Sequence, residues 1–296
     1  GSDGLDGQAL LSYQIFVENQ KQDIESAQFP DWMQPVNQFR NILSSAVQLA
    51  SGTGAQPFKT VKDYDEWLAR GSRIPVLVDQ IIANMREGMA AGVVMPRPLM
   101  EKVVPQFDAL IKDNPEESLF WGPISQMPKD FAEADRTRLT DAFRKLIVEQ
   151  INPAYQKQRD FIASEYLPKT RDSVGLDKLP NGAAWYAFNA RQSTTTDKTP
   201  AEIHDIGLKE VARIHDEIRK VMAEVKFQGS LQDFFEFMQT DKRFSFKDQE
   251  ALLAHYRALE AKINQKIPEQ FSLVPKAPFE IRPIEPFREK SAAGGE

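Results

Sequence analysis

Apolar residues recur three and four positions apart in two long stretches of the chain, and this spacing constrains the fold most strongly. The first stretch contains Ile74, Leu77, Val78, Ile81, Ile82, Met85 and Met89, and the second contains Val211, Ile214, Ile218, Val221 and Val225. Because an α-helix repeats every 3.6 residues, such spacing lines up side chains on one helix face. We expect two amphipathic helices, and we expect the apolar stripe of the second to lie in a core.

Capping signals support this interpretation. In the motif Thr199-Pro-Ala-Glu202, the threonine can accept from the start of the helix, the proline needs no donor there, and the glutamate can reach back to the cap. Further helices are predicted over about 5–27, 36–49, 98–113, 132–166, 183–191, 231–238 and 245–266. We expect Pro105 to kink or restart its helix and Pro153 to break the long one, since proline lacks a donor.

No alternation of strands and helices accompanies these elements, so the predicted fold class is mainly α: a multi-helical array with short proline-rich extended segments. We divide it into an N-terminal helix with proline- and glycine-rich loops at 1–59, a helical core at 60–271 and an extended proline-rich tail at 272–296, which could include an edge strand. The pattern leaves open that this is a partial domain.

The composition excludes several classes of function. The 37 basic residues are scattered among 43 acidic ones, and a net charge of -6 offers no positive field for nucleic acid. The absence of cysteine excludes disulfides, thiolate metal ligands and a cysteine nucleophile, but leaves the compartment open. No apolar run approaches the roughly 20 residues of a transmembrane helix, and the first residues lack the pattern of a signal peptide.

The chain has three histidines, His204, His215 and His255, which we considered as metal ligands. The first two lie eleven residues apart on one predicted helix, about 16 Å along its axis, so they cannot share one ion. We interpret His215 and His255 as ordinary surface or half-buried residues. His204 lies in the first helical turns, where the positive helix end attracts anions, although a packing role is the simpler interpretation.

The short aromatic stretch at 183–191 suggests a binding wall. Tyr186 and Arg191 could face a cleft, the arginine offering a cation for a carboxylate, whereas Trp185 and Phe188 are expected in the core. The threonines at 194–196 could bind a ligand or satisfy the free amides of the following helix. These residues alone indicate a helical protein with a weakly suggested cleft and no visible catalyst.

Several stretches together resemble a known family. They are RIPVLVDQIIANMREGMAAG at 73–92, PRP at 96–98, LPNG at 179–182, TTT at 194–196 and TPAEIHDIGLKEV at 199–211. In order and spacing they are similar to the bacterial family called domain of unknown function 885, from about Leu10 to the last residue, and the threonine-to-EIH segment is the most specific part.

The resemblance implies a largely helical, zinc-dependent metallopeptidase of the gluzincin type, often exported or lipid-anchored, which places the protein in the bacterial periplasm or cell envelope. Zinc would polarise the carbonyl of a peptide or related amide and activate water, with the motif glutamate as base. In the family the HExxH segment follows the tail matched here by 274–286. No catalytic residue, zinc ligand or cofactor can therefore be assigned within this chain, and zinc is expected in the full-length protein.

By resemblance, the region from Tyr186 to His204 would face the active cleft of the complete protein. Tyr186 would supply a hydroxyl, Arg191 a cation for a substrate carboxylate, and Thr195 or His204 a hydrogen bond. The expected function is the helical substrate-cleft portion of a zinc peptidase or amide hydrolase, inactive alone and partnered by a missing C-terminal segment of the same protein. The alternative is a non-enzymatic helical module that binds peptides or envelope components.

Overall fold

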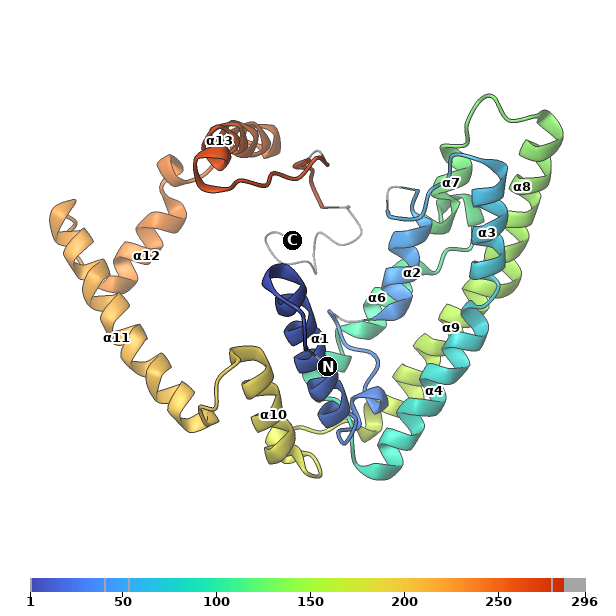
Figure 1. Cartoon of the computed structure of the whole chain (residues 1–296). Helices are drawn as coiled ribbons and strands as arrows, with labels where there is room; N and C mark the ends of the chain where they lie inside the picture. Colours follow the sequence, from blue (N-terminus) through green and yellow to red (C-terminus); the bar gives the residue numbers. More distant parts are fainter. Residues whose placement is uncertain (1, 40, 53, 278, 285–296) are drawn as a thin grey trace. The chain divides into compact units, whose positions relative to one another are not determined.

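The computed structural model describes residues 2–39, 41–52, 54–277 and 279–284. Within these ranges the regular secondary structure is helical, and the only extended pairings are isolated bridges between Val36 and Asn41 and between Pro96 and Arg171 (Figure 1). The predicted fold class, a mainly α multi-helical array, is confirmed. The chain forms two compact units, Gly1–Asp197 and Lys198–Glu296. The sequence-based division at residues 59 and 271 stays a prediction.

The first unit holds the larger set of helices. Its α-helices are α1 (Gly7–Ser26), α2 (Ile42–Ala50), α3 (Val61–Gly71), α4 (Ile74–Ala91), α5 (Arg97–Met100), α6 (Val103–Leu110), α7 (Gly122–Ser125), α8 (Glu133–Leu146), α9 (Asn152–Phe161) and α10 (Gly182–Thr194). Short 3-10 helices cover Asp31–Met33, Pro115–Glu117, Leu119–Trp121, Leu167–Lys169 and Leu176–Lys178. Helix α3 packs against α8, while α4 and α6 pack against α9 (Figure 1).

Helix α4 forms as its apolar spacing predicts. Pro75 lies in its first turn, and the inward face is buried, comprising Ile74, Val78, Ile81, Ile82 and Met85. Gly92 ends the helix in the left-handed conformation, with φ of 72°, which glycine adopts at little cost. The buried stripe packs α4 against α9.

The two internal prolines behave differently. Helix α5 ends at Met100, and α6 restarts at Val103, which leaves Pro105 in a first turn that needs no donor. The expected break at Pro153 is wrong: α8, a π-helical segment at Ile147–Ile151, α9 and a second π segment at Ile162–Tyr166 follow one another without interruption. The wider π turn just before α9 makes room for the proline ring and the carbonyl it frees.

The second unit contains α11 (Pro200–Glu224), α12 (Leu231–Thr240), a 3-10 helix (Lys242–Phe244) and α13 (Gln249–Gln270). The expectation that the α11 stripe lies in a core is wrong. Val211, Ile214, Val221 and Val225 are 44–60% exposed. Among the described residues of this unit, the buried apolar side chains are Met222, Phe234 and Leu253, so the unit has too little of a core to cover the stripe.

The described part of the tail, 271–277 and 279–284, forms neither helix nor strand. The alternating apolar residues suggested an edge strand, but the tail has no paired neighbour within the described residues. Proline at 275 and 283 removes amide donors that a ladder would use. The rest of the expected extended segment, 278 and 285–296, lies outside the described residues.

Candidate functional site

Helix α10 carries two of the four residues that the sequence analysis assigned to a substrate cleft, Tyr186 and Arg191. Trp185 and Phe188 are buried together with Phe29, Val93 and Leu179, so the prediction that both rings belong to the core is confirmed. The rings of Phe29 and Trp185 stack with centroids 5.9 Å apart. This anchoring leaves Tyr186 on the outer side of the helix, where it is 50% exposed.

A tight turn sets the start of α10. Asn181 adopts the left-handed conformation with φ of 54°, which asparagine tolerates better than most residues. At Gly182 a Cβ atom would lie 2.0 Å from the carbonyl oxygen of Leu176, so a side chain cannot be accommodated there without movement of the backbone. The LPNG sequence thus fixes the direction in which α10 leaves the core.

Arg191 is held by two partners in the first unit. Its Nη2 forms an ion pair with the Glu25 carboxylate of α1, and its guanidinium lies 5.7 Å from the centre of the Phe188 ring. Both charged side chains are 44% exposed, so the pair is screened by solvent. A substrate carboxylate that approaches Arg191 would have to compete with Glu25.

Thr195 lies directly after α10, with a left-handed φ of 54°. Its neighbours form the polar end of the helix: Thr194 Oγ1 donates to the Ala190 carbonyl at 2.8 Å and lies 3.0 Å from Thr196 Oγ1. Thr194 thus bonds the end of α10 and not the free amides of the following helix, whose cap is Thr199. The side chain of Thr195 is exposed.

His204 lies in the second unit, on the exposed side of the second turn of α11. The predicted capping box is confirmed: the Glu202 amide donates to Thr199 Oγ1 at 3.2 Å, and the Thr199 amide donates to Glu202 Oε2 at 2.7 Å. The Thr199 amide holds the pKa of the Glu202 carboxyl below its usual value. Tyr186 and Arg191 thus lie on α10 and Thr195 directly after it, whereas the grouping of these residues with His204 into one site stays a prediction.

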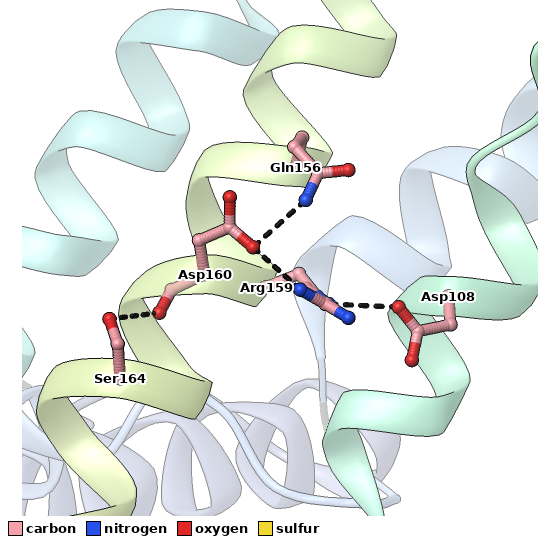
Figure 2. Close-up of polar contacts among 5 residues, drawn as sticks. All are labelled: Asp108, Gln156, Arg159, Asp160 and Ser164. Carbon is pink, nitrogen blue, oxygen red and sulfur yellow. Dashed lines mark hydrogen bonds and ion pairs between the residues drawn. The ribbon is translucent and has the colours of Figure 1, made fainter.

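The sequence analysis missed a polar network on α9, which Figure 2 shows. Arg159 donates through Nε to Asp108 of α6 and through Nη1 to Asp160, each at 2.8 Å. Gln156 donates to the same Asp160 oxygen at 2.8 Å, and Ser164 donates to the Asp160 carbonyl. The bonds from Arg159 and Gln156 hold the pKa of the Asp160 carboxyl below its usual value. Because Arg159 of α9 bonds to Asp108 of α6 as well as to Asp160, the network links α6 to α9.

A second bond between helices lies near the network. Arg86 of α4 forms a two-pronged pair with Glu165, which lies in the π segment after α9, at 2.8 and 2.7 Å. The partners are separated by 79 positions in the sequence, and the backbone at Glu165 is a π turn. No local spacing could have revealed this pair.

The residues that the structure describes do not fit a zinc site. Throughout the described residues, no three histidine, aspartate or glutamate side chains gather closely enough to hold a metal ion. Hollows of about 260 and 190 Å³ lie in the first unit, beside α8 and beside the loop at 52–59, and the predicted site residues line neither. In the described part of the chain, no helix is both long and apolar enough to span a bilayer.

The comparisons with known proteins agree with this architecture. A solved structure described as "the putative lipoprotein from Colwellia psychrerythraea" superposes with a TM-score of 0.79 at 20% identity, over 88% of this chain and 46% of that one. The chain thus spans less than half the length of that relative. No curated protein matches the chain. The profile of the family described as "Bacterial protein of unknown function (DUF885)" matches residues 2–296, and the chain therefore belongs to this family.

Proposed function

We propose that this chain is the helical substrate-cleft portion of a zinc-dependent peptidase or related amide hydrolase of the bacterial envelope. The observation that carries the proposal is the family match over residues 2–296, which includes every stretch on which the resemblance to metallopeptidase relatives rests. The lipoprotein description of the structural relative supports an envelope location. The greater length of that relative supports a larger complete protein.

In this proposal the metal and the general base belong to an HExxH segment that, by the resemblance, follows the part of the family matched by 274–286. The part of this chain is to bind and orient the substrate. Arg191 would attract a substrate carboxylate in exchange for Glu25, and Tyr186 would offer its exposed hydroxyl. Thr195 follows the end of α10 and His204 lies near the start of α11, and either side chain would form a hydrogen bond with the substrate.

The first test is made on the protein isolated from its source cell. We expect an intact mass well above 33.6 kDa, bound zinc in elemental analysis, and hydrolysis of a peptide library that a zinc chelator stops. We expect the 296-residue chain alone to be inactive in the same assay. A mature product of 33.6 kDa without hydrolytic activity would reject the proposal and favour the non-enzymatic binding module.

The role of Arg191 is tested in the complete protein with a matched pair of variants. Arg191→Ala should raise KM for peptides that present a free carboxylate by about tenfold to a hundredfold, since a charged hydrogen bond contributes about 1.5–3 kcal/mol. Glu25→Gln removes the competing partner and should leave KM unchanged or lower it. If both variants change turnover equally, the pair acts only by holding α1 against α10.

A further inference from the structure

Helix α11 exposes a continuous apolar face. The α11 stripe consists of Val211, Ile214, Ile218, Val221 and Val225, of which Ile218 is half-buried and the others are exposed. From first to last it extends about 21 Å along the helix. Proteins rarely expose apolar surface in so continuous a form without a partner for it.

The rest of the α11 surface, beside and behind the stripe, has the features of a solvent-exposed face. Arg213 pairs with Glu210 at 2.8 Å and with Glu217 at 3.0 Å, all within the helix. Arg219 pairs with Asp216 at 2.6 Å. These charges satisfy one another one turn apart, as exposed helix faces commonly do. The contrast between the two faces indicates that the stripe, and not the charged face, is built for contact.

Helix α13 repeats the pattern in the same unit. The α13 stripe consists of Tyr256, Leu259 and Ile263, spaced by three and four residues and 44–53% exposed. Only Leu253 of α13 is buried. Two long helices of one unit therefore each present an apolar face, although the described residues of that unit bury few side chains of their own.

We propose that the α11 and α13 stripes are the surface on which the remaining part of the same polypeptide packs. The inference rests on the proposed function, in which the metal-bearing part lies outside this chain. The occupant is argued from length: the match takes in 88% of this chain but only 46% of the relative, so more than half of the relative lies outside the part that shares this fold. We expect the surface of the remaining part that contacts the stripes to be apolar and helical, since ridges of aliphatic side chains fit the grooves of another helix.

The chain contains no cysteine, which permits a direct test. The reactivity of a single introduced thiol shows whether that one position is covered or exposed. Ile214→Cys places the thiol in the α11 stripe. Ala212→Cys places it on the opposite face of the same helix and serves as the control, since Ala212 is exposed. Both are made in the 296-residue chain and in the complete protein, and the rate of reaction with a maleimide is measured against the unsubstituted protein.

We expect the Ile214→Cys thiol to react at least tenfold more slowly in the complete protein than in the 296-residue chain. The Ala212→Cys thiol should react at similar rates in both. Equal rates for Ile214→Cys in the two proteins would overturn the inference, and so would protection already present in the 296-residue chain. Protection that appears only as the concentration of that chain is raised would instead assign the stripe to a second copy.

This outcome is independent of the proposed chemistry. A complete protein that protects the stripe but holds no zinc and cleaves no peptide would keep the inference and reject the proposed function. An active zinc peptidase whose Ile214→Cys thiol remains fully reactive would support the proposed function and reject the inference.

Discussion

At the scale of single residues, buried tyrosine hydroxyls tie distant backbone segments to the helices of the first unit. Tyr155 donates to the Leu43 carbonyl at 2.7 Å, and Tyr64 donates to the Pro123 carbonyl at 2.8 Å. Tyr166 accepts from the Met95 amide at 3.0 Å. Each bond joins residues at least 59 positions apart. These hydroxyls hold α2 against α9, α7 against α3, and the segment before α5 against the π segment at Ile162–Tyr166.

Replacing Tyr155 by phenylalanine tests this role. The ring would remain packed, but the buried Leu43 carbonyl would lose its donor. We expect Tyr155→Phe to lower the free energy of unfolding by about 1–3 kcal/mol in urea titrations. Tyr186→Phe is the matched control: its hydroxyl is on a half-exposed side chain, and its removal should change stability by less than about 0.5 kcal/mol. Equal effects of the two substitutions would contradict the prediction.

Tyr64 makes stability depend on pH in alkaline solution. Burial raises the pKa of its hydroxyl to about 12. Between pH 10 and 12 the unfolded chain releases this proton while the folded protein keeps it, so the free energy of unfolding falls as pH rises. The fall attributable to Tyr64 is at most about 1.4 kcal/mol per pH unit.

The measurement compares the original protein with Tyr64→Phe in urea at pH 9, 10 and 11. At pH 9 the variant should be less stable, because it lacks the bond to the Pro123 carbonyl. That deficit should shrink from pH 10 upward, since only the original protein loses the contribution of Tyr64. A deficit that stays constant over this range would show that the hydroxyl titrates equally in both states.

At the scale of elements, the sequence predicted what local chemistry decides. The capping box at Thr199, the buried stripe of α4 and the restart of a helix near Pro105 depend on neighbours within a few positions. The bond from Arg86 to Glu165 and the pairing of Arg191 with Glu25 depend on distant partners and were not predictable. The exposure of the α11 stripe was not predicted for a related reason. The spacing of residues shows that a helix face is apolar, but it does not show which segment covers that face.

The same distinction predicts that α11 depends strongly on its cap. With one buried side chain in 25 residues, it draws little stability from a core. Thr199→Ala removes the acceptor for the Glu202 amide and should cost about 1 kcal/mol locally. Hydrogen exchange in the first bonded turns of α11 should accelerate about fivefold, whereas the adjacent Lys198→Ala should leave it unchanged. Acceleration spread over the first unit would contradict a local effect.

At the scale of the whole molecule, the chain joins two units of unequal cores through a short exposed linker. The first unit buries large side chains such as Trp67, Phe107 and Tyr155. The buried apolar residues described for the second are Met222, Phe234 and Leu253. Between them, 195–199 lies outside any helix and is exposed. This arrangement predicts that the units differ in stability and that the linker is the first site of cleavage.

Lys198 makes the linker a substrate for trypsin, which cuts after lysine and needs an exposed, extensible backbone. Brief digestion of the 296-residue chain should release a stable product ending at Lys198, while the remainder is degraded because it protects few residues in a core. Lys198→Gln should abolish this product without changing the urea midpoint of the first unit. If the first cuts fall instead within α4 or α9, the unit with the larger core is not the more stable one. The reaction rates of the thiols in α11 would then come from a chain in which the first unit unfolds before the second.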